Sequence, residues 1–321
     1  MTTRLRIGSR PSALALAQTG LVSRLLQALV SGLEVEVVPI STTGDRLTTA
    51  SLARVGGKGL FIREIEEALS AGRIDLAVHS LKDLPAVLAP EYRLAAVPER
   101  ENPCDALITR EGGGWLALPP GVRLGTSSAR RRLEALRLRP ALVVMPLRGN
   151  VDTRLRRLDA GDFDAIILAM AGLKRLDRLA GLNALELDER DFIPSAGQGA
   201  LALETLAATR PAGSAELAEA LARLDDPATR AEVSAERAFL ATIGASCVSP
   251  VGVKGTARNN HLSLRALLFS LDGQRSLADE SEQPWPHPSS PDESIVRATA
   301  AGVALGDRMI ARGARELIAD G

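Results

Sequence analysis

Short apolar runs alternate with helical patterns over the first two-thirds of this 321-residue chain, and this alternation is the strongest constraint on its fold. Apolar runs at 5–9, 33–40 and 73–80 alternate with segments such as 11–30, whose apolar residues recur at helical spacing. A second series of the same kind runs over 122–172. Strands that alternate with helices in this way indicate βαβ units and a mainly parallel sheet. The chain is therefore predicted to contain two similar α/β domains.

From Asp225 onward the pattern changes. A helical segment at 228–243 is followed by strand-like segments at 251–257 and 262–270, and then by a long C-terminal helix. This order predicts a smaller C-terminal α+β domain. The predicted boundaries are 1–98 with 199–222 for domain 1, 104–194 for domain 2 and 225–321 for domain 3.

Composition argues against several kinds of partner. The 39 basic and 39 acidic residues balance and aromatic residues make up 2% of the chain, so we expect no nucleic-acid binding. The N-terminus lacks the apolar stretch of a secretory signal, and Gln18 and Arg24 interrupt the longest apolar stretch, so we expect no membrane association. Two cysteines and three scattered histidines give neither a disulfide framework nor a metal site. We therefore expect a cytoplasmic, monomeric protein without a metal ion.

Several predicted strand ends carry hydroxyl groups and cations together. In α/β sheets ligands bind at the carboxyl ends of strands, where helix N-termini favour anions. Serine or threonine at a helix start next to arginine is suited to binding carboxylates or phosphates. Ordinary helix capping and a solvated arginine face would also explain each site taken alone. The residues concerned are Arg10, Ser12, Thr126, Ser127, Ser128, Arg130, Arg131, Arg132, Arg148, Arg154, Lys174 and Arg175.

The segment 77–85, AVHSLKDLP, ends a predicted strand with Asp83 beside Lys82. Pro85 disfavours helix in the residue before it, so Asp83 is predicted to lie on an extended edge. Two interpretations remain open from spacing alone. The two side chains could form a surface ion pair of little energetic value, or Asp83 could manage protons and stabilise a positive intermediate in a cationic cleft.

The glycine-rich segment 55–61, VGGKGLF, contains Lys58 and Phe61. It does not match a phosphate-binding P-loop, because Gly59 follows Lys58 where serine or threonine is required. We interpret it as a mobile loop that delivers Lys58 near a cleft, as a lid would. The alternative is a plain loop before the helix predicted at 60–72.

The segment 243–252, IGASCVSPVG, places Cys247 among small residues and a proline, which is typical of a loop. An accessible thiol there could be a nucleophile, a redox sensor or a covalent anchor. A nucleophile in acyl transfer would need a histidine base, and no histidine stands in a recognisable arrangement, so that option is weak. An anchor needs no base once its bond is made. The other cysteine, Cys104, follows Pro103 and is interpreted as structural.

Nine motifs, in this order, resemble those of the porphobilinogen deaminase (hydroxymethylbilane synthase) family over almost the whole chain. They are GSRPSALALAQ, GGKGLF, AVHSLKDLP, GTSSARR, LRGNVDTRL, DAIILAMAGLKRL, PSAGQGAL, AERAFL and the Cys247 loop. The resemblance implies two α/β domains like those of periplasmic binding proteins, and a third domain that carries the cysteine. It implies a transferase of tetrapyrrole biosynthesis, which joins four porphobilinogen molecules head to tail, with loss of ammonia, into linear hydroxymethylbilane.

The resemblance also implies roles for individual residues. The product would grow on a dipyrromethane cofactor bound through a thioether to Cys247. Asp83 would contact the pyrrole nitrogens, assist loss of the amino group and stabilise the positive intermediate. Further cofactor contacts would be Lys82, Asp83, Thr126, Ser128, Arg130, Arg131, Arg148, Gly172 and Gln198. Substrate contacts would be Arg10, Ser12, Gln18, Arg148, Arg154, Ala169 and Arg175, and the mobile loop would contribute Lys58 and Phe61.

The chain departs from the family pattern near the cysteine. Residues 245–246 are Ala-Ser where glycines are usual, residues 248–250 read Val-Ser-Pro, and Arg54 stands where lysine is common. Two other functions compete with the deaminase interpretation. A non-catalytic, two-lobed anion-binding protein would use the arginines but would have no need of Cys247. A pyridoxal-phosphate enzyme would instead use Lys82 as its attachment point.

Overall fold

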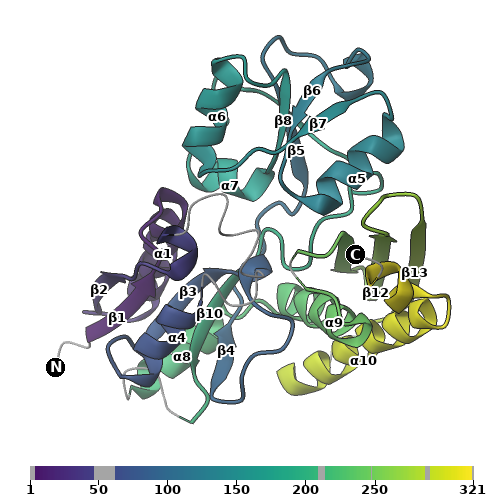
Figure 1. Ribbon diagram of the computed structural model, residues 1–321. Helices are drawn as coiled ribbons and strands as arrows, with labels where there is room; N and C mark the ends of the chain where they lie inside the picture. The colour runs from purple at the N-terminus through teal and green to yellow at the C-terminus, as the bar shows by residue number, and fades with distance from the viewer. Residues whose placement is uncertain (1–3, 47–61, 209–213, 247, 286–289, 320–321) are drawn as a thin grey trace. The chain divides into compact units, whose positions relative to one another are not determined.

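The computed structural model describes residues 4–46, 62–208, 214–246, 248–285 and 290–319 (Figure 1). The chain forms two compact units. Unit 1 comprises Met1–Arg100 and Ala200–Arg230, and unit 2 comprises Glu101–Gly199 and Ala231–Gly321. The predicted loop residues Lys58 and Phe61 and the predicted anchor Cys247 lie outside the described residues.

Unit 1 contains a mixed five-stranded sheet. Its elements are β1 (Arg4–Ser9), α1 (Ala13–Leu29), β2 (Glu34–Pro39), α2 (Thr43–Arg46), α4 (Arg63–Ser70), β3 (Leu76–Ser80), the 3₁₀ turn η1 (Leu81–Asp83), β4 (Tyr92–Ala96), β10 (Leu201–Leu206) and α8 (Ala215–Leu224). The strand order is β2-β1-β3-β10-β4, with β1 parallel to β2 and β3, and β10 antiparallel to both of its neighbours. Alternate residues of β1, Leu5 and Ile7, are buried in one core cluster with Leu26 of α1.

The first part of unit 2 repeats this sheet. Its elements are β5 (Asp105–Thr109), the 3₁₀ turn η2 (Trp115–Ala117), β6 (Arg123–Gly125), α5 (Ala129–Leu138), β7 (Val143–Met145), α6 (Val151–Asp159), β8 (Ala165–Ala169), α7 (Met170–Arg175) and β9 (Asn183–Glu186). The strand order β7-β6-β8-β5-β9 has the same pattern of directions as in unit 1. Ile108 packs with α6 and α7, whereas its neighbour Leu107 packs with α5, so both faces of the sheet are covered (Figure 1).

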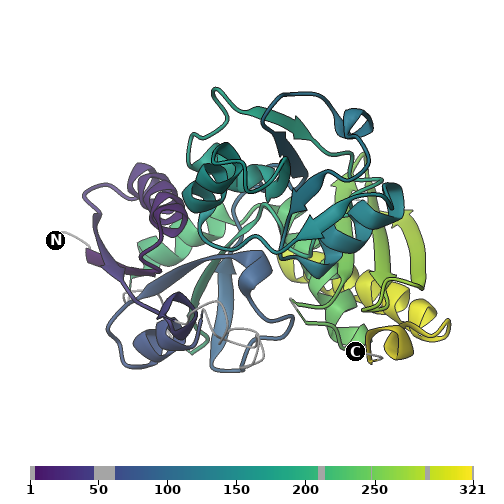
Figure 2. The same ribbon diagram turned by 45° about the horizontal axis from the view of Figure 1, so that its top comes forward.

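The C-terminal part of the chain forms an antiparallel sheet with helices. Its elements are α9 (Pro227–Ile243), β11 (Val251–Arg258), β12 (His261–Phe269), β13 (Ser276–Pro284), α10 (Pro291–Ile310) and α11 (Ala314–Ala319). The strands are ordered β11-β12-β13, and the yellow C-terminal helices lie beside them (Figure 2). Gly302 of α10 lets that helix approach α9, because a Cβ there would lie 2.1 Å from the carbonyl oxygen of Ala235. The predicted fold class, two α/β sheets and a smaller α+β part, is confirmed.

Four details of the sequence prediction are wrong. The two larger sheets are mixed rather than mainly parallel, because apolar periodicity does not specify strand direction. Strand β13 was not predicted, since its residues are mostly polar and give no alternating apolar signal. The apolar run 164–172 is a strand only to Ala169, after which α7 begins. Asp83 lies in η1 and not on an extended edge; the residue that Pro85 constrains is Leu84, with φ −80° and ψ 149°.

Among the described residues, no helix is long and apolar enough to cross a bilayer.

Candidate active site

A small pocket in unit 1 lies where β1 and β3 end and α1 begins. Its volume is about 60 Å³, and its polar lining consists of Arg10, Ser12, Gln18, His79, Ser80 and Asp83. Ser12 caps α1 by accepting a hydrogen bond from Ala15 N at 3.3 Å. Gln18 Nε2 donates to Ser80 Oγ at 2.9 Å, which joins the helix to the end of the strand. The structure therefore brings together four residues predicted as site residues: Arg10, Ser12, Gln18 and Asp83.

The Asp83 carboxylate is presented by a turn that is fixed on both sides. Leu81 and Leu84 are buried, Leu81 N donates to Ala200 O at 3.1 Å, and Leu84 N donates to Leu81 O at 3.0 Å. Between them Lys82 is half-buried and Asp83 is exposed. The local sequence explains this arrangement, because two leucines anchor the turn in the core and leave the residues between them outside it.

Arg10 is held by a carboxylate of its own unit. Arg10 Nε donates to Asp45 Oδ1 at 3.1 Å, and Thr42 Oγ1 donates to Asp45 Oδ2 at 2.7 Å. Burial alone would raise the pKa of Asp45, but the hydrogen bonds from Arg10 and Thr42 outweigh it and leave that pKa below its ordinary value. Asp45 therefore stays ionised and orients the guanidinium of Arg10 at the pocket.

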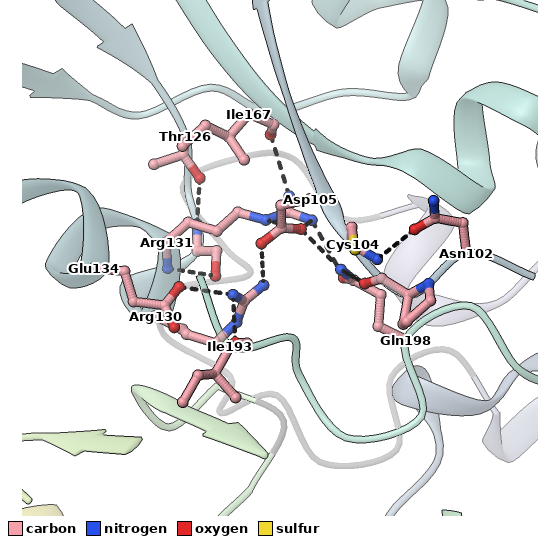
Figure 3. Close-up of polar contacts among 12 residues, drawn as sticks. Asn102, Cys104, Asp105, Thr126, Arg130, Arg131, Glu134, Ile167, Ile193 and Gln198 are labelled. Carbon is pink, nitrogen blue, oxygen red and sulfur yellow. Dashed lines mark hydrogen bonds and ion pairs between the residues drawn. The ribbon is translucent and has the colours of Figure 1, made fainter. Parts of the chain in front are cut away.

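In unit 2, the buried carboxylate of Asp105 gathers three predicted cofactor contacts (Figure 3). Asp105 is 0% exposed. Arg131 donates to Oδ1 through Nε at 3.0 Å and Nη2 at 2.6 Å, Gln198 Nε2 donates to the same oxygen at 2.8 Å, and Arg130 Nη2 donates to Oδ2 at 2.8 Å. Burial would raise the pKa of Asp105, but the charges of Arg130 and Arg131 outweigh it and hold that pKa far below its ordinary value. Asp105 thus fixes Arg130, Arg131 and Gln198 in one array.

Arg130 extends this array to the C-terminal sheet. Its Nη1 donates to Glu134 Oε2 at 2.8 Å and to the carbonyl oxygen of Ile193 at 2.8 Å. Burial raises the pKa of Glu134 to about 8, although the charge of Arg130 acts in the opposite direction. A Cβ on Gly252 of β11 would lie 2.5 Å from Ile193 O and 3.2 Å from Glu134 Oε1, so only glycine allows this approach.

A second cavity, of about 250 Å³, lies at the N-terminus of α5. Its lining includes Thr126, Ser127, Ser128, Arg132 and Arg148. Ser128 caps α5 by accepting from Arg131 N at 3.4 Å, and Thr126 Oγ1 accepts from Ser128 N at 3.2 Å. Hydroxyl groups, a helix N-terminus and two guanidinium groups make this cavity suited to an anionic ligand.

Two further predicted substrate contacts are half-buried cations. Arg154 Nε donates to Gly149 O at 2.7 Å, and Arg175 Nη2 donates to Gly199 O at 2.6 Å. Neither guanidinium forms a salt bridge with any carboxylate of the described ranges. Burial lowers the pKa of each to about 10, and the nearby charge of Arg131 adds to the effect on Arg154. No anion of the described residues offsets the burial of Arg154, and for Arg175 the nearby charge of Glu101 offsets it only in part.

The remaining predicted residues of unit 2 lie around α7 and the cysteine loop. Ala169 occupies the N-cap position of α7, and Gly172 is buried within that helix. Beside Cys247, which is outside the described residues, Ser246 N donates to Ser249 Oγ at 3.0 Å, and Val248 is exposed.

Sequence reasoning missed Asp105, Glu134 and the pair of His79 with Glu204. The sequence contains one indication of the importance of Asp105, because this charged residue stands directly before the apolar run 106–109. A charge at the start of a strand buried on both faces must be compensated by a partner. The identity of that partner depends on chain segments far apart in sequence, and no periodicity specifies it.

Comparison with known proteins agrees with this geometry. The family model "Porphobilinogen deaminase, dipyromethane cofactor binding domain" matches residues 5–212, and "Porphobilinogen deaminase, C-terminal domain" matches residues 230–311. Porphobilinogen deaminase of Roseiflexus castenholzii is 49% identical over 277 residues, which is 85% of this chain and 88% of the relative. That of a Roseiflexus species is 45% identical over 320 residues, 99% of this chain and 100% of the relative.

Among solved structures, the BenM effector binding domain with benzoate is 13% identical, with a TM-score of 0.41 and coverage of 68% of this chain and 90% of that one. That likeness carries no functional argument, and the family assignment rests on the sequence matches. The chain belongs to the porphobilinogen deaminase family and builds hydroxymethylbilane on a dipyrromethane cofactor.

Proposed function

We propose that Asp83 is the carboxylate that acts on the reacting pyrroles, and that the arginines of unit 2 hold the carboxylates of the cofactor and growing product. One observation supports the role of the unit 2 arginines. Arg154 and Arg175 are half-buried cations without a salt bridge among the described residues, and burial lowers the pKa of each. A cation in that position is stabilised when an anion joins it.

The chemistry of the cofactor and substrate fits these residues. Each porphobilinogen carries an acetate and a propionate, so negative charge accumulates as the product grows. The guanidinium groups of Arg131, Arg148, Arg154 and Arg175 and the capped N-terminus of α5 supply donors of the matching charge. Dipyrromethane, when bound, supplies the pyrrole carbon at which the chain is extended. Thr126, Ser128, Lys82, Gly172 and Gln198 are the further contacts proposed for it.

Cys247 is proposed as the covalent attachment point. The only other cysteine, Cys104, is buried, and burial together with Glu186 raises the pKa of its thiol to about 12. A thiol with so high a pKa is almost entirely protonated at neutral pH and is a poor nucleophile. Cys247 is therefore the better candidate for the thioether.

Asp83 can act in two ways through its carboxylate. When ionised, it stabilises positive charge that develops on a pyrrole placed in its pocket. At a carboxylate oxygen it can also hold the proton of the departing aminomethyl nitrogen. Arg10 and Ser12, in the same pocket, bind the side-chain carboxylates of the incoming substrate in this proposal.

Several coarser features belong to the same proposal. The domain boundaries 1–98 with 199–222, 104–194 and 225–321 are supported by the passage of the chain between the two units near residues 100 and 200. A monomeric state and a cytoplasmic location complete the proposal, and both rest on the composition of the chain.

Intact mass and turnover test these assignments together. Purified wild-type protein should exceed the mass of its chain by one dipyrromethane, and Cys247→Ser should not. Asp83→Asn should keep the added mass but consume porphobilinogen about 10²–10⁴-fold more slowly, the range expected for a lost general acid–base group. Asp159→Asn, an exposed aspartate at the end of α6, is the matched control. Near-normal turnover of Asp83→Asn, or added mass on Cys247→Ser, would show the corresponding role to be wrong.

A further inference from the structure

We propose that His79 and Glu204 form a buried proton-holding pair at the Asp83 pocket, in which Glu204 positions the imidazole of His79. In this proposal His79 takes up the proton that each condensation step releases, and gives it back before the next step. The inference rests on the role proposed above for Asp83, because it assigns a further residue to the same pocket.

The sheet of unit 1 brings the two side chains together. In the antiparallel pairing of β10 with β3, Ala202 lies opposite His79, and Glu204 lies opposite Ala77. His79 and Ala77 are two residues apart, so His79 and Glu204 emerge on the same face of the sheet. His79 Nε2 lies 2.9 Å from Glu204 Oε2, and the two side chains are 4% and 0% exposed.

Stabilisation of the fold is a poor explanation for this pair. A buried ion pair is often no more stabilising than apolar residues of the same volume. Apolar side chains in place of this pair could pack against Ile65, Ala68 and Ala77, which form an apolar cluster in this part of the unit. Moreover, Glu204 Oε1 is buried and has no hydrogen-bond partner among the described residues, so the carboxylate is only half satisfied. Because burying a half-satisfied carboxylate destabilises the fold, the presence of this pair points to a function.

The histidine of the pair belongs to the lining of the proposed reaction site. His79 lines the same pocket as Asp83, Arg10 and Ser80. With Glu204 ionised, Nε2 of His79 carries the ring proton and donates it to the carboxylate, which leaves Nδ1 as an acceptor. No hydrogen bond of Nδ1 occurs within the part of the chain that the structure describes. A carboxylate at one ring nitrogen stabilises the positive charge that protonation of the other creates.

The proton balance of the reaction requires a proton acceptor, and His79 Nδ1 can fill this role. In each step the aminomethyl nitrogen is protonated, the bond between the aminomethyl carbon and this nitrogen breaks, and the nitrogen keeps the electron pair and leaves as ammonia. A pyrrole carbon then forms a bond to that aminomethyl carbon and loses its own proton. His79 Nδ1 accepts this proton, and the departing ammonia carries it away as ammonium. Atoms and charge balance, and the pair returns to its starting state.

Other charged groups surround the pair. Glu66 on α4 faces it, and burial together with the charge of Glu204 raises the pKa of Glu66, while the charge of His79 acts in the opposite direction. Glu91 contributes to the same field, and Asp83 and Arg10 lie in the pocket. Glu204→Gln also removes the charge that raises the pKa of Glu66, whereas His79→Gln keeps Glu204, so the two variants together separate an effect through Glu66 from one through His79.

The test compares pH profiles of kcat for cofactor-loaded wild type, Glu204→Gln and His79→Gln. Glu204→Gln preserves shape and a hydrogen bond but removes the negative charge, so protonation of His79 becomes less favourable. The acidic limb of its profile should move to lower pH. In His79→Gln the acidic limb of the kcat profile should no longer contain the contribution from protonation of His79. Its kcat should fall about 100-fold, at the lower end of the general acid–base range, with KM little changed.

Asp225→Asn is the matched control, because it removes the carboxylate of a pair with Arg230 in the same unit, away from the pocket lining. It should lower thermal stability without moving the pH profile. An acidic limb at the wild-type position in Glu204→Gln would overturn the proposal, as would near-normal kcat in His79→Gln. Should His79→Gln fail to fold, the Glu204→Gln profile alone decides.

These outcomes are distinct from those for Asp83. Inactive Asp83→Asn together with unchanged His79 and Glu204 profiles would refute this inference and leave the proposed function intact. Near-normal Asp83→Asn would refute the role on which both rest.

Discussion

The Asp105→Asn substitution would test the electrostatic array of unit 2 directly. Asparagine keeps the size of the side chain and removes its charge. Two guanidinium groups, Arg130 and Arg131, would then remain buried with their common carboxylate gone, and one asparagine N–H would face their donors. Glu134 could compensate only in part, because its carboxyl group contacts Arg130 and burial raises its pKa to about 8.

The magnitude follows from the burial of all partners. Asp105 is 0% exposed, and removing one member of a buried ion pair typically costs about 3–5 kcal/mol. Two cations lose their partner here, so we expect the upper half of that range. For folded units of this size each kcal/mol lowers the melting temperature by about 2–4 °C, so a decrease of about 8–20 °C is expected.

The pH dependence gives this prediction a second readout. The pKa of Asp105 is lower in the folded than in the unfolded chain, where it is about 3.9. Its stabilisation is therefore fully present above the unfolded pKa and is lost as pH falls toward the folded value. At pH 5 the full difference in melting temperature between wild type and Asp105→Asn should be present. Toward pH 8 it should narrow, because the charge of Asp105 helps to raise the pKa of Glu134 and without it Glu134 ionises more readily beside Arg130. Below about pH 4 it should shrink.

Thermal unfolding followed by circular dichroism measures both effects. Asp164→Asn is the matched control, because Asp164 also pairs with an arginine, Arg123, in the same unit but is 35% exposed. Exposed pairs contribute little, so the control should melt close to wild type. If Asp105→Asn melts at the temperature of Asp164→Asn, or its deficit does not depend on pH, the array does not stabilise the fold as argued.

Three further predictions follow from the same geometry. Burial raises the folded pKa of Glu134 to about 8, whereas the unfolded pKa is about 4.3, so ionisation of Glu134 destabilises the folded protein as pH rises through this range. The free energy of unfolding of Glu134→Gln should equal that of the wild type at pH 4 and exceed it at pH 8 by up to about 5 kcal/mol. Denaturant unfolding at both pH values would measure this difference. Arg154→Met should raise KM for porphobilinogen about 10–100-fold, the value of a lost charge-assisted hydrogen bond, without lowering the melting temperature; a lower melting temperature with unchanged KM would mean a structural role. In Cys247→Ser, iodoacetamide at pH 8 should add no mass to the folded protein, because the pKa of Cys104 is about 12, and rapid labelling would contradict that environment.

Local sequence signals predicted most elements of the fold. The run Leu5–Ser9, the helix that follows it and the caps Ser12 and Ser128 all occur where apolar spacing and capping chemistry place them. These features depend on residues a few positions apart, whose effects are nearly independent of the rest of the chain. Strand β13 was not predicted from the sequence, because an edge strand needs no apolar alternation and is stabilised by its pairing with β12.

The sequence by itself determined which chemical groups the protein possesses and, through its nine motifs, the family to which it belongs. Tertiary structure decided how these groups are used. The pairing of β3 with β10 brings Glu204 to His79 across 125 positions, and Asp105 meets Gln198 across 93. Asp105 then stays ionised, because the charges of Arg130 and Arg131 outweigh the cost of its burial. Such environments arise only when distant segments pack, and for that reason no local pattern encodes them.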